Sequence, residues 1–166
     1  MPCPTAGFIQ QQKSGASGLA QRTMPKQINM FLLVGALLSA IAAILHLLMI
    51  VGGPGWYRFF GAGERFAVAA AQGSYYPAMV TAGIAAVLSV WSVYALAGAG
   101  AIHRLPLLRP VLIGIAAIYL VRGIAFAPAV LGTGGQITPF VLWSSAICLG
   151  FGMVHLVGLI QRWPEL

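Results

Sequence analysis

Acidic residues are almost missing from this sequence of 166 residues, which contains no aspartate and only two glutamates, Glu64 and Glu165. Charged residues of both signs make up 7% of the chain, whereas hydrophobic residues make up 60%. A water-soluble domain carries about a quarter charged residues, which keep its surface hydrated. The composition therefore excludes an ordinary soluble domain and predicts a protein that crosses a membrane several times.

Metal-binding and catalytic patterns are also missing. The two cysteines, Cys3 and Cys148, lie in an N-terminal arm and in an apolar run, so neither a disulfide nor a paired-cysteine metal site is expected. His46 and Met49 supply only two ligands for copper or haem, which do not make a site. No catalytic serine or cysteine arrangement, phosphate-binding loop or dinucleotide-binding fingerprint is found. We therefore expect no cofactor and no metal, and the sequence does not indicate an enzyme.

Four apolar segments of about 20 residues or more are each long enough to cross a hydrocarbon core of roughly 30 Å. They comprise residues 30–51, 77–97, 110–131 and 139–160. Pro77, Pro110 and Pro139 stand where helices would begin, a position at which proline is tolerated because no N–H is needed there. The predicted fold class is all-α: an integral membrane four-helix bundle with up-down topology, forming a single domain over residues 28–163.

The charges predict the orientation of this bundle. Residues 1–27 are polar and are expected to form a disordered arm, with Met24 as an alternative start. Lys and Arg residues are spread between the apolar segments, so the formal charge of +7 does not indicate a nucleic-acid partner. Basic residues in short flanking segments stay in the cytoplasm. The basic arm, Arg104, Arg109 and Arg162 therefore predict cytoplasmic termini, with the lipid bilayer as a partner.

The first outer loop, residues 52–76, has more structure than a linker needs. Four residues rich in glycine, 52–55, should break the first helix. A short helix over residues 64–71 is expected to lie in the membrane interface, either without a chemical role or as a lid over an outer-leaflet pocket. Trp91 and Tyr94, at the cytoplasmic end of the second span, are also expected in the interface. The predicted interfacial anchors in the loop are Trp56, Tyr57 and Arg58.

Arg122 is the residue that most needs an explanation. It lies near the middle of the third span, where a charged side chain costs about 2.5–3.5 kcal/mol on insertion scales. Its side chain is expected to lean toward the cytoplasmic end of its helix, which makes an outward reach awkward. Its charge is neutralised by Glu64 folding inward, by a bound anion or lipid headgroup, or by a partner chain. At similar depth lies His46, and the predicted polar cluster is completed by Tyr75, Tyr76 and Tyr119.

Structural alternatives accompany each of these residues. Arg122 would lock the bundle if it bound backbone carbonyls, tyrosine hydroxyls and water. Glu64 suits a helix N-terminus and would then pair with Arg58. His155 lies near the inner end of the fourth span, more than about 10 Å from His46 along the membrane normal. The two histidines are therefore not expected to bind one metal ion or one haem.

Small residues recur at a spacing of four on two spans: Gly35, Ser39 and Ala43 on the first, and Ala146 and Gly150 on the fourth. This spacing allows helix backbones to approach closely. It predicts packing within one bundle or, as an alternative, an interface with a second copy of the chain or with another membrane protein.

The stretch from His46 to Arg65, with Gly52-Gly53-Pro54-Gly55-Trp56 at its centre, resembles that of small four-span bacterial membrane proteins, and the layout of residues 28–160 is similar to that of DoxX-like proteins. The resemblance implies a four-span fold in a bacterial inner membrane. Some DoxX relatives are accessory subunits in quinone-linked sulfur oxidation, so the resemblance implies that such a role is open to this chain. No functional residue is carried over by position.

Three functions remain open at this point. The first is a non-enzymatic accessory or binding protein whose polar site in the outer half of the bundle takes an anion or a lipid headgroup. The second is a quinone-linked redox subunit in which His46, Tyr76 and Arg122 bond a quinone carbonyl. The third is a small oligomeric transporter.

Overall fold

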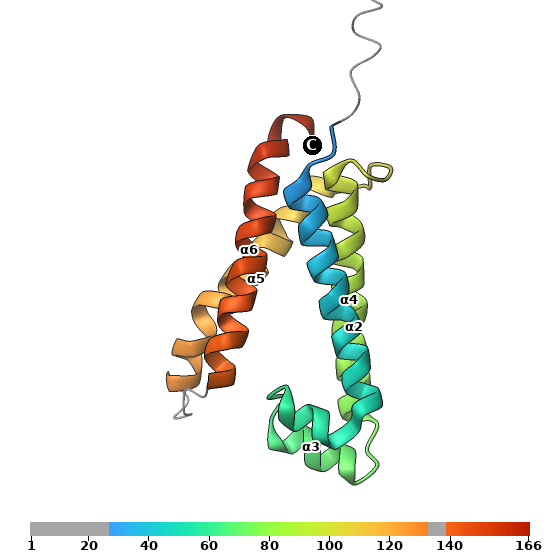
Figure 1. Cartoon of the computed structure of the whole chain (residues 1–166), viewed down its shortest axis with the longest axis vertical. Coiled ribbons are helices and arrows are strands. Elements are labelled where there is room, and N and C mark those ends of the chain that lie inside the picture. The colour runs from blue at the N-terminus through green and yellow to red at the C-terminus, as the bar shows by residue number, and fades with distance from the viewer. Residues whose placement is uncertain (1–26, 133–138) are drawn as a thin grey trace, which may run out of the picture.

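The computed structural model describes residues 27–132 and 139–166, and these residues form an all-helical bundle (Figure 1). Its four long helices are long and apolar enough to cross a membrane, which confirms the predicted multi-pass fold. The predicted N-terminal arm and the loop before the fourth span lie almost entirely outside the described residues. In chain order the elements are α2 (Met30–Phe59), α3 (Glu64–Ala71), α4 (Tyr76–Ala99), α5 (Leu108–Gly132), α6 (Pro139–Arg162) and the 3₁₀ turn η1 (Trp163–Glu165).

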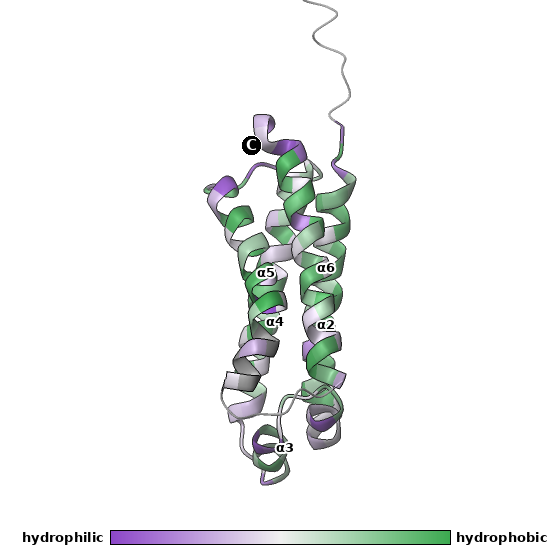
Figure 2. Cartoon of the chain, turned by 90° about the vertical axis from the view of Figure 1, so that its left-hand side faces the viewer, coloured by the Kyte–Doolittle hydropathy of each residue, from purple (hydrophilic) through white to green (hydrophobic). Residues whose placement is uncertain are grey.

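The two ends of the bundle differ in what they hold. Gln27 and Arg162 are hydrogen-bonded to each other, so the beginning and the end of the described chain share one end of the bundle, which we call the termini end. The opposite end, covered by α3, is the α3 end (Figure 1). Figure 2 shows hydrophobic residues along most of the length of α2 and α6. Large apolar side chains on all four long helices are exposed, as expected for surfaces that face lipid.

Helix α2 changes direction at Gly53. This residue has φ +65° and ψ −151°, outside the helical region, and Pro54 follows it. Glycine adopts such a conformation without the clash that a Cβ would cause. The predicted break over residues 52–55 is therefore confirmed, but the aromatic residues that follow continue as a helical segment to Phe59. The last turn of α2 and the short helix α3 together cover the α3 end.

The long helices pack as two pairs, α2 with α4 and α5 with α6, and the pairs meet mainly at the termini end. Gly158 allows α6 to approach α2, since a Cβ at this position would lie 2.9 Å from the backbone nitrogen of Leu32. The Ser92 hydroxyl on α4 donates to the carbonyl of Ala36 on α2 at 2.8 Å. Toward the α3 end the two pairs separate (Figure 1).

Only one of the two small-residue patterns packs inside the bundle. Gly35, Ser39 and Ala43 are all buried, which confirms the packing prediction for α2. Ala146 and Gly150 are exposed. On α6 the contact with α5 uses Gly152 instead, because this residue lies on a different face of the same helix and a Cβ there would be 2.8 Å from the Leu120 side chain. An interface with a second copy through the exposed pattern stays a prediction.

Candidate functional site

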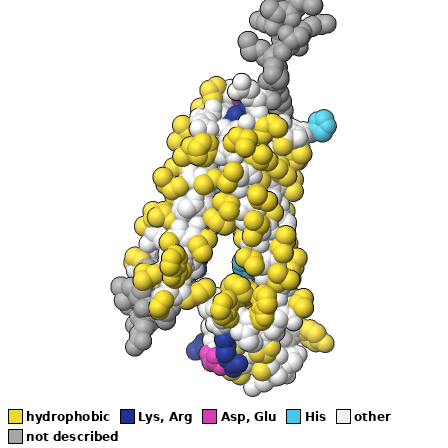
Figure 3. Space-filling view, in the orientation of Figure 1, with side chains coloured by type: hydrophobic (Ala, Val, Ile, Leu, Met, Phe, Trp, Pro, Cys, Tyr) yellow, Lys and Arg dark blue, Asp and Glu magenta, His cyan; other side chains and the backbone are white. Residues whose placement is uncertain are grey.

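The residues of the predicted polar cluster lie in several separate places in the structure. Glu64 is one that lies apart from Arg122. Glu64 begins α3 and accepts hydrogen bonds from Arg58 Nε at 3.0 Å and Arg58 Nη2 at 2.7 Å. These bonds, with the charge of Arg58, hold the pKa of the Glu64 carboxyl below its ordinary value. Both side chains are exposed, and Figure 3 shows acidic and basic groups together at the α3 end. Glu64 therefore does not fold inward to Arg122, because Arg58 is six residues away and reaches it directly.

Tyr119 belongs to a second, buried cluster. Its hydroxyl lies 3.1 Å from the Ser39 hydroxyl on α2. Its ring packs edge-to-face against Trp91 of α4, with centroids 5.1 Å apart, and against Phe151 of α6 at 5.4 Å. Tyr119 thus links three other helices. Trp91, expected in the membrane interface, instead packs into the core because α4 turns this residue toward α5.

His155 completes this buried cluster and was not among the predicted site residues. It is 1% exposed, and its ring lies 5.4 Å from that of Tyr119. Its Nδ1 donates to the carbonyl of Phe151 at 2.8 Å, since a carbonyl oxygen can only accept. A Cβ at position 35 would stand 2.8 Å from the ring, so Gly35 makes room for it. The sequence feature that could have indicated this contact is the similar depth of the two residues. Gly35 lies five residues from the termini-end boundary of α2, and His155 lies seven residues from that of α6.

His46 lies well away from His155, as predicted. It is half-buried, and its Nδ1 donates to the carbonyl of Ala42 at 2.7 Å, a contact within its own helix. His46 is eleven residues beyond Gly35, which touches His155. At 1.5 Å per residue this places the two histidines about 16 Å apart along α2. This separation is too large for both rings to coordinate one metal ion.

The aromatic residues at the α3 end also separate into exposed and buried groups. Tyr75 and Tyr76 are exposed where α4 begins, with the Tyr76 ring 5.8 Å from that of Phe66 on α3. Trp56 is exposed, but Tyr57 is 2% exposed and packs with Met49 and Ala67. The helical segment after Gly53 turns Tyr57 inward, where it holds α3 on α2 and does not face lipid.

Arg122 contacts the neighbouring helix of its own pair. Its Nη2 donates to the Ser144 hydroxyl of α6 at 3.2 Å, and its side chain is half-buried. Gly123 marks the depth at which α5 meets α6, since a Cβ there would lie 2.8 Å from the backbone nitrogen of Leu149. Ser144 precedes Leu149 by five residues, or about 7 Å toward the α3 end. The guanidinium group therefore extends outward, against the expected lean, because its long stem covers the distance of little more than one helical turn.

A hollow separates the two helix pairs at this depth. Figure 3 shows the surface opened between the two pairs in the half of the molecule near the α3 end. On the side of the hollow nearer the termini end, Ser39 and Tyr119 join the pairs. At the α3 end, Gly61 meets the ring of Phe140, where an added Cβ would stand 2.3 Å from Cδ1. Ser144 is four residues from Phe140 and eleven from His155, so the Arg122–Ser144 contact lies at the depth of the hollow.

Among the described residues, no group of three or more His, Cys, Asp or Glu side chains lies close enough together to hold a metal ion. Compared with protein-family models, curated proteins and solved structures, the chain matches none. The resemblance to DoxX-like proteins therefore stays a prediction.

Proposed function

We propose that this multi-pass membrane protein is a non-enzymatic binding protein, whose ligand is an anionic amphiphile such as a phospholipid. In this proposal the headgroup enters the hollow sideways, between the two helix pairs. The observation that carries the proposal is the position of Arg122, which reaches Ser144 at the depth of the hollow.

Electrostatics support an anionic ligand. The chain has two side-chain carboxylates, and both bind other arginines: Glu64 binds Arg58, and Glu165 binds Arg162. Arg122 itself places a positive charge inside an apolar span. Attraction between charges is much stronger in a poorly solvated site than in water. Arginine also offers a planar fork of N–H donors that matches the oxygens of a phosphate or carboxylate.

The surroundings support an amphiphile over a small soluble anion. The hollow opens sideways between helices whose outer faces carry exposed apolar side chains. Such surfaces contact lipid chains, so a lipid can place its headgroup in the hollow while its chains stay in the membrane. The resemblance to DoxX-like proteins supports an accessory role of this kind within a larger membrane assembly.

We further propose that the termini end faces the cytoplasm. This proposal is supported by Arg104, Arg109 and Arg162, which lie at the termini end in short segments beside the spans. Fusion of a reporter that is active only in the cytoplasm to Leu166 tests it. Activity of the fused reporter is expected, and its absence would reverse the orientation.

The binding site is tested by comparing Arg122→Gln with the wild-type chain by native mass spectrometry. The wild type is expected to retain an anionic lipid or other acidic amphiphile that Arg122→Gln loses while staying inserted and folded. Arg65→Gln is the matched control, because Arg65 is an exposed arginine on α3. Equal retention by Arg122→Gln and wild type would overturn the proposal.

Two further results would redirect it. If Arg122→Gln fails to assemble while Ser144→Ala is normal and retains the same ligands, Arg122 locks the bundle instead of binding a ligand. A quinone in the lipid extract, with a matching absorbance spectrum, would favour the quinone-linked redox role.

A further inference from the structure

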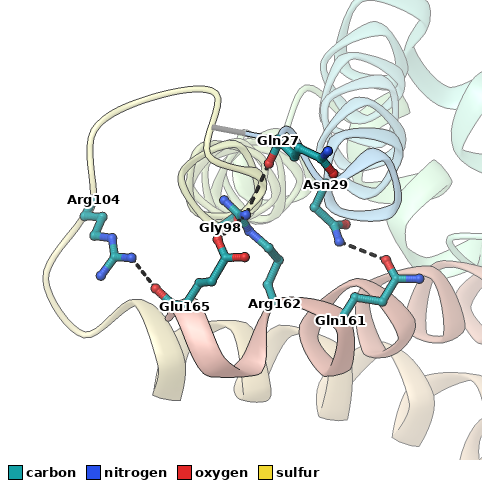
Figure 4. A network of polar contacts seen from close by, with 7 residues as sticks. All are labelled: Gln27, Asn29, Gly98, Arg104, Gln161, Arg162 and Glu165. Atoms are coloured by element: carbon teal, nitrogen blue, oxygen red, sulfur yellow. Dashed lines mark hydrogen bonds and ion pairs between the residues drawn. The ribbon is translucent and has the colours of Figure 1, made fainter. Parts of the chain in front are cut away.

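The termini end carries a polar network that is independent of the hollow. Arg162 is 7% exposed and donates from Nε to the Gly98 carbonyl at 3.3 Å and from Nη1 to the Gln27 carbonyl at 3.1 Å. The same Nη1 also binds the carboxylate of Glu165. Figure 4 shows these residues around the end of α6. The Glu165 carboxylate, the nearest acidic side chain, is therefore already engaged by a buried arginine.

Two more arginines stand beside this network and are bound differently. Arg104 Nη2 donates to the backbone carbonyl of Glu165, and Arg109 Nη2 donates to that of Trp163 at 3.2 Å. Both acceptors are neutral. Within residues 27–132 and 139–166, neither Arg104 nor Arg109 forms an ion pair with a glutamate side chain. Both arginines are exposed, so the termini end presents two positively charged side chains that donate hydrogen bonds to neutral carbonyls.

The backbone holds both guanidinium groups in place. Arg109 lies over the ring of Trp163, 5.5 Å from its centroid. The carbonyl contact of Arg104 ties the loop before α5 to η1, after the end of α6. Groups that are already oriented lose less conformational entropy when they bind a ligand. Arg104 and Arg109 should therefore lose less conformational entropy on binding a ligand than two surface arginines without such contacts.

Arg104 and Arg109 line one shallow pocket of about 270 Å³. The other side chains that line it are apolar, and Leu107, just before α5, is 72% exposed. A free phosphate ion requires no apolar wall, whereas a lipid presents a phosphate and hydrocarbon together. The apolar lining residues are Leu105, Leu107, Leu108, Pro110 and Leu166.

We propose that Arg104 and Arg109 bind the phosphate of an anionic phospholipid from the membrane leaflet at the termini end, with the glycerol and the first part of the acyl chains against Leu107 and Leu108. The site is distinct from the hollow near Arg122, because Arg122 is thirteen residues beyond Arg109 on α5, or about 20 Å along the helix. Arginine binds phosphate oxygens with two parallel hydrogen bonds, and the two guanidinium groups on one pocket supply the charge that selects an anionic over a zwitterionic headgroup.

The test uses the full chain in detergent with added phosphatidylglycerol or phosphatidylcholine, and counts retained lipids by native mass spectrometry. The double variant Arg104→Gln/Arg109→Gln is expected to retain one phosphatidylglycerol fewer than wild type, with its apparent affinity for the lost lipid at least tenfold weaker. Phosphatidylcholine retention should not change. The matched control, Arg65→Gln, should retain phosphatidylglycerol as the wild type does. Arg122→Gln should leave this lipid bound, which separates this proposal from the proposed function.

A charge-preserving variant keeps the test decisive. Arg104→Lys/Arg109→Lys is expected to bind phosphatidylglycerol within a few-fold of wild type, so loss of folding in the glutamine variant would not prevent a result. Equal retention of the two lipids by wild type, or wild-type retention by the glutamine variant, would overturn the proposal. Complete displacement of phosphatidylglycerol by inorganic phosphate at equal concentration would overturn the assignment to a lipid.

Discussion

The imidazole ring of His155 on α6 lies against the backbone of Gly35 on α2, so closely that a Cβ at position 35 would stand 2.8 Å from ring atom Cε1. This contact joins the two helix pairs at the termini end. His155 is buried and also contacts Tyr119 of α5, so its ring has little freedom to move. The two helix pairs are therefore held together in the half of the bundle near the termini end, whereas the hollow lies between them in the half near the α3 end.

Gly35→Ala is expected to destabilise the protein. Overpacking of a filled core costs about 1–3 kcal/mol, and the buried ring of His155 cannot yield as an exposed side chain would. Thermal unfolding in detergent measures the change. Gly150→Ala is the matched control, because a Cβ there meets no heavy atom within 4 Å and alanine improves a helix by about 0.5–1 kcal/mol. A wild-type melting temperature for Gly35→Ala would contradict the closeness of this contact.

Arg162→Gln should weaken the termini end more than Glu165→Gln. Arg162 is buried and donates to two backbone carbonyls besides Glu165, whereas Glu165 is exposed. Loss of hydrogen bonds from a buried charged donor costs about 1.5–3 kcal/mol each, and the loss of a partly exposed ion pair costs about 0.2–1 kcal/mol. Unfolding in a denaturing detergent series measures both variants. Equal effects would mean that the ion pair, and not the carbonyl contacts, stabilises this end.

Ser39 and Tyr119 are expected to be energetically coupled. Their hydroxyls are 3.1 Å apart and buried, so Ser39→Ala or Tyr119→Phe leaves one hydroxyl without its partner. Each single change should cost about 1–3 kcal/mol, and the double variant should cost less than the sum because no orphaned hydroxyl remains. A double-mutant cycle measured by unfolding should give a coupling energy of about 0.5–1.5 kcal/mol. Additive effects would exclude a stabilising bond between these hydroxyls.

The Arg58–Glu64 pair should break only in acid. The pKa of Glu64 is lowered by hydrogen bonds from Arg58, so the carboxylate form is favoured in the folded state. The contribution of the pair is therefore present above the ordinary pKa of glutamate and is lost as the pH falls through the lowered value. Nuclear magnetic resonance titration of the Glu64 carboxyl carbon measures this value. In Arg58→Gln the pKa should rise toward its ordinary value, while in Arg65→Gln it should stay where it is in wild type.

The spans, the break at Gly53 and helix α3 were all predictable because each depends on a short stretch of chain. An apolar run of about 20 residues has the length of the hydrocarbon core, and glycine and proline act on the backbone where they stand. Gly35 and Ser39 were also predictable as packing residues, because their spacing places them on one face of a helix. The contact partner of each was not predictable from that spacing.

The polar cluster was predictable only in part, as Glu64 and Tyr119 show. Both were expected near Arg122 because of their depth in the membrane and because the chain offers few polar partners for an arginine. In the structure Glu64 bonds to Arg58 and Tyr119 bonds to Ser39. Depth along a span follows from residue number, but the direction in which a side chain points depends on the rotation of its helix, and that rotation is determined by contacts with other helices.

The sequence by itself determined that this protein has four helices long and apolar enough to cross a membrane, where each begins to within about two residues, and that one arginine lies within the third. These features follow from hydrophobic length and local backbone preference. Only the tertiary structure decided that the helices pair two by two, that His155 joins the pairs through Gly35, and that Arg122 reaches Ser144 of α6. The physical reason is that such contacts depend on close packing between segments far apart in the chain, which no single segment specifies.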